Sequence, residues 1–300
     1  MSTMRKQVEI ARRVQGLRSS ADIQDHVAPL HAAALKRANL WTAITGLLAL
    51  TACLAGLLLD GVYSGAASTA EMLRAYDIVT AAVVVPGLAV ATWMAHHGSV
   101  RAPLMCLSLL AYLAYTYAYY VFGTGFNDLF LLHAGVLGAG LVALVLQAVG
   151  TDLASAARQL PNRTRVAVAS AILALLAIAL WGMWAYAALD NALTGEVPTG
   201  SRLVETDSIV HLGMALDLAL LVPLYAAAAI LLWRHRPWGY VLGTVSLVAG
   251  LLHQVTYILA MPFQVSAHIA GAVSFDPGEP FIVLLYLIGG VALLFPAHQR

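Results

Sequence analysis

The sequence lacks several features that define common classes of protein. No lysine follows Lys36, so a retinal Schiff base, which needs a lysine inside the membrane, is excluded. The only two cysteines, Cys53 and Cys106, stand alone in apolar runs, which excludes a CxxC redox pair and a cysteine-based zinc site. Motifs for nucleotide binding, HExxH zinc proteases and GxSxG hydrolases are also missing.

Charged residues are scarce. They make up 10% of the chain, against 61% hydrophobic residues, and the mean hydropathy is +0.81. So little polar surface cannot cover a soluble domain, which predicts an all-α integral membrane protein surrounded by membrane lipids. The net charge of +1 gives no indication of a nucleic-acid partner. The predicted location is the cell membrane, with multiple crossings.

Eight apolar segments are predicted to cross the membrane as helices. All but the last approach or exceed the roughly 17–25 residues that a crossing helix needs. They are 41–59, 75–95, 102–122, 129–149, 165–189, 207–233, 238–261 and 281–296. With a cytoplasmic N-terminus, fourteen of the sixteen Lys and Arg residues fall on the inner side and only Arg74 and Arg202 fall outside. The positive-inside rule therefore predicts that both termini are cytoplasmic.

The domain organisation is predicted to be two tandem four-helix units of the same orientation. The divisions are a basic cytoplasmic segment at 1–40, a first unit at 41–149, a cytoplasmic linker at 150–164 and a second unit at 165–300. In the first segment, Ile10, Val14 and Leu17 share one face of a short amphipathic helix that would lie on the inner leaflet.

An internal repeat supports the two units. An Asp, a Gly and an Asp stand at positions 60, 65 and 77, and again at 190, 195 and 207. Prolines also recur as Pro86 and Pro223, although another register pairs Asp77 with Asp217. Because each unit has an even number of spans, the two units would be related by rotation about the membrane normal.

Three histidines on three spans are predicted to share one layer of the membrane. His133, His211 and His253 lie roughly 6–12 Å below the outer boundary if each residue rises by about 1.5 Å. Ionisable groups at this depth are costly unless they are paired or hydrated, which makes them candidates for function. Each of them can also be an ordinary hydrogen-bonding contact between helices.

Other polar residues accompany these histidines. Asp207 precedes His211 by four residues, so its carboxylate could orient the imidazole, and His253 and Tyr257 have the same spacing. Asp217 is expected slightly deeper, as a buried general base or counter-charge. Ten of the fifteen acids lie at or beyond the outer boundary. The tyrosine-rich run 112–120, together with aromatic residues near 181–186, is interpreted as an outer aromatic belt.

Three functions fit this pattern. The leading hypothesis is a membrane-embedded enzyme for a lipid-soluble substrate. It would use either zinc, held by three imidazoles with an open position for water, or haem, held by two of them. The first alternative is a cation- or proton-coupled small-molecule transporter, favoured by the acidic outer face and by Asp217. The second alternative is a structural or sensory membrane subunit, which needs no such site. Each is compatible with a homo-oligomer.

Overall fold

The computed structural model of the protein describes residues 20–198 and 201–295. The described residues form helices and no strand. In chain order the helices are α2 (Ser20–Leu58), α3 (Ala67–Val79), η1 (Thr80–Val84), α4 (Val85–His96), α5 (Ala102–Ala118), η2 (Tyr119–Gly123), α6 (Phe130–Gly150), α7 (Leu153–Arg158), α8 (Arg163–Thr194), α9 (Asp207–Leu216), η3 (Asp217–Leu221), α10 (Val222–Trp233), α11 (Pro237–Ser266) and α12 (Glu279–Leu294). The amphipathic helix predicted around Ile10 lies outside the described residues.

Seven helical stretches of the described chain are long and apolar enough to cross a membrane. The last helix, α12, is apolar but has only 16 residues. Large apolar side chains such as Leu131 and Ile178 lie on the outside of the bundle, where 83% and 69% of their surface is exposed. Exposed apolar surface is what a lipid environment requires. The structure therefore indicates an α-helical, multi-pass membrane protein. The eighth crossing and the orientation of the termini stay predictions.

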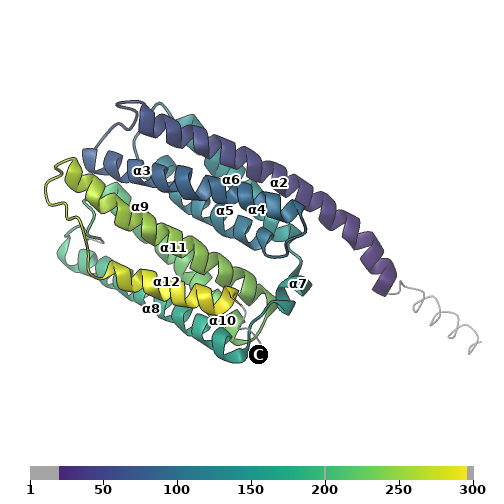
Figure 1. The fold of residues 1–300 in the computed structure, drawn as a ribbon. Helices are drawn as coiled ribbons and strands as arrows, with labels where there is room; N and C mark the ends of the chain where they lie inside the picture. The colour runs from purple at the N-terminus through teal and green to yellow at the C-terminus, as the bar shows by residue number, and fades with distance from the viewer. Residues whose placement is uncertain (1–19, 199–200, 296–300) are drawn as a thin grey trace, which may run out of the picture.

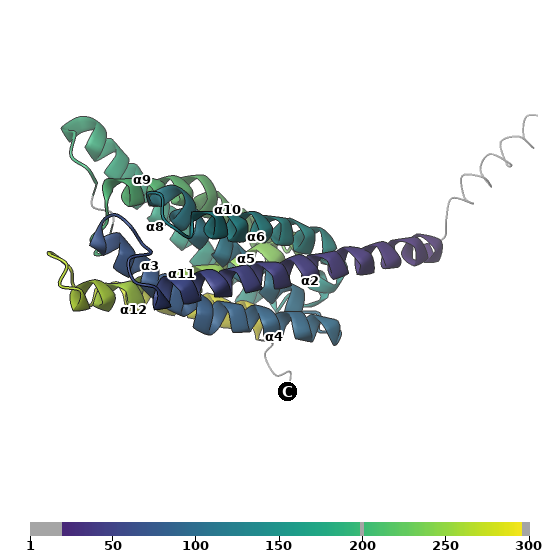
Figure 2. The ribbon, with the colours of Figure 1, turned by 90° about the horizontal axis from the view of Figure 1, so that it is seen from above.

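The helices form two adjacent groups whose axes run in similar directions (Figure 1). The first group contains α2 to α6, and the second contains α8 to α12. In each group the first helix packs against the second and the fourth, and the third helix also packs against both. The long helix α2 extends past the other helices at its N-terminal end (Figure 2). The duplication of a four-helix unit itself stays a prediction.

Helix α11 joins the two groups, because it packs against α3 and α5 of the first group as well as against α10 and α12 of the second. A second junction forms where α9 packs against the π-helical turn η2. Side chains of α3 and α5 can therefore reach the interior of the second group. The predicted linker at 150–164 contains the short helix α7, which packs on α11.

Two of the three π-helical turns have a clear cause. Turn η1 ends two residues before Pro86, and turn η3 ends two residues before Pro223. A proline has no N–H to donate and its ring collides with the carbonyl group four residues earlier. Widening the preceding turn to a π-helix relieves that collision. The turn η3 begins with Asp217, so the widened backbone lies at the acid that the sequence predicts to be functional.

Candidate functional site

The structure does not bring the three predicted histidines together. His133 is fully buried in the first group, where its ring centroid is 4.7 Å from that of Tyr120. His253 lies at the junction of the groups, with its ring 4.7 Å from that of Tyr115. His211 is exposed on α9. In the described part of the chain, no three His, Cys, Asp or Glu side chains are placed to hold one metal ion. The predicted three-histidine metal centre is therefore not formed.

The histidines do not meet because the depth of a residue in the membrane does not determine the direction in which its side chain points. Counting residues gives the level of a side chain along the membrane normal, but the face of each helix that turns inward depends on packing. Asp207 and His211 are both exposed on α9, and the structure records no hydrogen bond between their side chains. The predicted orientation of His211 by Asp207 is therefore not seen.

A large cavity lies inside the second group instead. Its volume is about 780 Å³, and it is lined by α8, α9, η3, α10, α11 and α12 together with tyrosines of α3, α5 and η2. It reaches the loops that join α8 to α9 and α11 to α12. The charged lining residues are Arg202, Glu205, Asp217, Asp276 and Glu279. We call this space the acidic cavity, because four carboxyl groups face one guanidinium group.

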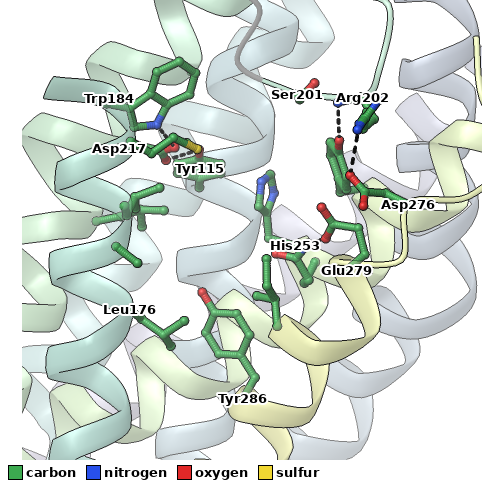
Figure 3. A pocket seen from close by; sticks show the side chains of 18 of the residues that line it. Tyr115, Leu176, Trp184, Ser201, Arg202, Asp217, His253, Asp276, Glu279 and Tyr286 are labelled. Atoms are coloured by element: carbon green, nitrogen blue, oxygen red, sulfur yellow. Dashed lines mark hydrogen bonds and ion pairs between the residues drawn. The ribbon is translucent and has the colours of Figure 1, made fainter. Parts of the chain in front are cut away.

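The single arginine is already paired. Its Nε lies 3.6 Å from Oδ2 of Asp276 at the rim of the cavity (Figure 3). Asp217, Glu205 and Glu279 have no basic partner among the lining residues. Burial raises the pKa of Glu279 to about 7. As these carboxyl groups ionise, the unbalanced charge inside the cavity becomes negative, which attracts a cation and repels an anion.

Asp217 is fixed by donors from two other helices. The hydroxyl of Tyr115 on α5 donates to Oδ1 at 2.6 Å, and Nε1 of Trp184 on α8 donates to Oδ2 at 2.7 Å. Both contacts are visible on one side of the cavity (Figure 3). Hydrogen bonds to an ionised oxygen are stronger than those between neutral groups. The carboxylate of Asp217 is thus held in one position at the start of η3.

His253 lies between the two acidic sides of the cavity. In Figure 3 it stands between Asp217 on one side and Glu279 on the other. Its Nδ1 is buried and has no hydrogen-bond partner in the structure. The next residue, Gln254, donates a hydrogen bond to Glu279 from its side-chain amide. A ligand in this cavity would therefore meet His253 as well as the two carboxyl groups.

The rim of the cavity is held by polar contacts in the loop before α9. The backbone N–H of Arg202 donates to the hydroxyl of Tyr257 at 2.9 Å, and the hydroxyl of Ser201 donates to Glu205 at 2.7 Å. Burial raises the pKa of the Glu205 carboxyl above its usual range; the Ser201 hydrogen bond opposes this shift and the charge of Asp217 adds to it. Tyr257, predicted as a partner of His253, thus positions the loop that carries Glu205.

The floor of the cavity is a pair of tyrosines. The hydroxyls of Tyr225 on α10 and Tyr286 on α12 are 2.8 Å apart and share a hydrogen bond. Both rings are buried and belong to a tightly packed apolar cluster that continues toward the opposite end of the group. Gly250 faces this pair, and a methyl group there would collide with both tyrosines. The cavity therefore reaches the loops at one end, and closely packed side chains lie beyond the two tyrosines at the other.

The first group contains a buried polar cluster. Asp77 is fully buried and accepts hydrogen bonds from Tyr63 at 2.5 Å and Tyr120 at 2.9 Å. Gly56 leaves room for this cluster, since a Cβ there would collide with Asp77 and Tyr63. Both ring nitrogens of His133 are buried beside these tyrosines without a partner. The sequence analysis identified Asp77 as a member of the internal repeat and did not predict this buried cluster.

The tyrosine-rich run is not an aromatic belt. Tyr112, Tyr117 and Tyr120 are fully buried, whereas only Trp181 and Tyr186 on α8 have the exposure expected of a belt. Five tyrosines within nine residues of α5 and η2 spread over more than half of the helix circumference, so some must turn inward to the core and the cavity. That argument from helical geometry could have identified Tyr115 as a site residue.

Comparisons of the chain with protein-family models, with curated proteins and with solved structures give no match. The function must therefore be argued from the acidic cavity and its chemistry.

Proposed function

We propose that this protein binds a small organic cation in the acidic cavity and that it is a cation- or proton-coupled membrane transporter. One observation carries the proposal: a cavity of about 780 Å³ inside the second helix group contains four carboxyl groups and one arginine. Its volume falls within the range of roughly 300–1,000 Å³ that is typical of small-molecule sites.

The lining suits a cation with apolar substituents. Besides the carboxyl groups, the walls contain six tyrosines and a tryptophan, among them Tyr115, Trp184 and Tyr286. The faces of aromatic rings attract cations, and quaternary ammonium groups are commonly bound by such rings. A strongly hydrated metal ion would instead need several oxygen ligands converging on one point, and the described residues offer no such group.

Access from one end supports a role in transport. The cavity extends from the loops at one end of the bundle to the Tyr225 and Tyr286 pair, beyond which the side chains are closely packed. A site that reaches one end of the bundle and is separated from the other end by packed side chains would correspond to one state of an alternating-access cycle. The π-helical turn at Asp217, followed by Pro223, lies in the wall of the site. Such irregular turns are suitable hinges, because their hydrogen bonding is already weakened.

The metal- or haem-dependent enzyme is not part of this proposal. Of the three predicted histidines, only His253 lines the cavity. A zinc site with three imidazoles or a haem with two axial histidines would need further histidines there, and His133 and His211 point elsewhere. The residues that line the cavity therefore do not fit either group.

Choline is a suitable probe, because its uncharged isostere, 3,3-dimethylbutan-1-ol, has nearly the same shape. We expect calorimetric titration of the purified protein to show binding of choline and at least tenfold weaker binding of the isostere. A unit charge about 5 Å from a carboxylate interacts by about 3 kcal/mol at an effective dielectric constant of about 20. Solvent screening reduces this value, and the remaining 1–2 kcal/mol corresponds to about a tenfold change in affinity.

Matched variants test the location of the site. Glu279→Gln and Asp217→Asn each remove one charge from the cavity and should each weaken choline binding about tenfold or more. Asp128→Asn removes the same charge from an exposed residue that does not line the cavity and should leave the affinity unchanged. Equal binding of choline and the isostere, or equal loss in all three variants, would contradict a cation site in this cavity.

Transport is tested separately in proteoliposomes. Vesicles loaded with unlabelled choline should accumulate labelled choline by exchange, and Glu279→Gln should slow this accumulation relative to Asp128→Asn. Binding without any exchange would show that the cavity is a receptor or enzyme site and would remove the transport part of the proposal.

A further inference from the structure

A second cavity lies directly beside the acidic cavity. It has a volume of about 450 Å³ and is lined by residues of α5, α6, η3, α10 and α11, between the two helix groups. Nearly all of its lining is aliphatic or aromatic carbon, with no acidic or basic side chain except His253. Phe122, Leu141 and Leu220 at its edge are exposed on the outside of the bundle. We call this space the apolar cavity.

The two cavities share one wall. Tyr115, Leu221, Tyr225 and His253 line both of them. Leu221 is the last residue of the π-helical turn that begins with Asp217. The acidic cavity and the apolar cavity are thus separated by only one layer of side chains.

The shared wall is itself amphipathic. The hydroxyl of Tyr115 donates to Asp217, and that of Tyr225 shares a hydrogen bond with Tyr286. Asp217 and Tyr286 line the acidic cavity but not the apolar cavity. The hydroxyl groups of Tyr115 and Tyr225 therefore face the acidic cavity, and their ring carbons face the apolar cavity. An amphipathic wall matches a ligand that has one charged end and one apolar end.

We propose that the ligand is a long-chain amphiphilic cation whose head group occupies the acidic cavity and whose alkyl tail reaches the apolar cavity when the side chains of the shared wall, His253 among them, move apart. This inference rests on the proposed cation-binding function and names the class of ligand. The charge of the first cavity selects the head group. The exposed apolar edge of the second lets an alkyl chain enter sideways from the lipid.

The chain length of the ligand tests this proposal. Each methylene group transferred to an apolar site raises affinity by about fourfold, so decyltrimethylammonium should bind more tightly than choline. Part of that gain comes from partition into detergent or lipid. The partition of a given ligand is the same for all protein variants. The informative quantity is therefore the ratio of the affinities of two variants for the same ligand.

The decisive variant is Ala114→Trp, which adds bulk to the apolar cavity at a residue of α5 that lines this cavity and not the acidic cavity. It should weaken decyltrimethylammonium binding at least tenfold and leave choline binding unchanged. Val145→Trp adds the same side chain to an exposed position of α6 that lines neither cavity, and should leave both affinities unchanged. An unchanged affinity for the long-chain ligand in Ala114→Trp, or an equal loss for both ligands, would overturn the proposal.

A measurement on the unmodified protein covers the case in which Ala114→Trp does not fold. A long-chain trimethylammonium probe with a photoreactive diazirine at its tail should label α6 near Leu137, Leu141 and Leu144, which line only the apolar cavity. Excess choline should suppress this labelling, because it competes for the head-group site. Labelling that choline does not suppress would mean that the tail binds as ordinary lipid, and would overturn the inference. Failure of choline itself to bind would instead reject the proposed function.

Discussion

Replacing Gly250 by alanine should break the floor of the acidic cavity. Gly250 lies on α11 opposite the hydrogen-bonded pair of Tyr225 and Tyr286, and a methyl group there would collide with the ring of Tyr286 and the hydroxyl of Tyr225. Neither ring can move freely, because both are buried in the apolar cluster of the second helix group. The substitution must therefore displace one ring and separate the two hydroxyls.

The expected cost follows from these contacts. Overpacking a close-packed core costs about 1–3 kcal/mol, and a lost hydrogen bond between buried groups adds about 1 kcal/mol. Alanine is the better helix former by about 0.5–1 kcal/mol, which offsets part of the cost. The net loss in the free energy of unfolding should be about 1–3 kcal/mol, seen as a lower melting temperature of the detergent-solubilised protein.

Gly182→Ala is the matched control. Gly182 also lies inside a long helix, α8, but a Cβ there would meet no atom within 4 Å. This variant should keep the gain in helix propensity without any clash, so its melting temperature should be unchanged or slightly raised. Equal melting temperatures for Gly250→Ala and Gly182→Ala would refute the packing that we describe for the floor.

Three further predictions follow from the same structure. Asp77→Ala should lower the free energy of unfolding in a denaturant titration by about 1–3 kcal/mol, because it leaves the hydroxyl of Tyr63 without an acceptor, while Tyr120 can still donate to the backbone oxygen of Leu73. Unchanged stability would show that the cluster is hydrated. Choline affinity measured from about pH 8 to pH 5 should fall as the pH falls. Burial, with the charge of Asp276 adding to it, raises the pKa of Glu279 to about 7, inside this range, and burial also raises the pKa of Glu205, so Glu279→Gln should flatten the profile. Cysteines introduced in the loop 61–66 should react with an impermeant reagent from outside intact cells while one near Arg158 should not; the reverse pattern would invert the topology.

The helices could be predicted from the sequence because each one depends mainly on its own composition. Apolar runs such as 207–233 are long enough to cross a membrane, and their breaks at Pro86 and Pro223 could be located from the missing N–H of proline. The structure adds that these breaks take the form of π-helical turns. The widening of a turn depends on the backbone around the proline, which the sequence does not specify.

The site was predicted only in part. Asp217 and His253 were identified as unusual intramembrane residues, and the structure places both in the wall of one cavity. His133 and His211 were assigned to the same site by their depth, which does not determine the direction in which a side chain points. Glu205 could not be identified as a member of the site, because a folded loop carries it into the cavity. The cavity itself arises from the way whole helices pack and has no signature in the sequence.

A structure of the protein with saturating choline tests the central claim most directly. The account predicts that the trimethylammonium group lies in the acidic cavity, between the carboxyl groups of Asp217 and Glu279 and within about 6 Å of the centre of at least one aromatic ring. Choline bound elsewhere, or a cavity without choline under conditions in which calorimetry shows binding, would contradict the assignment of this cavity as the cation site.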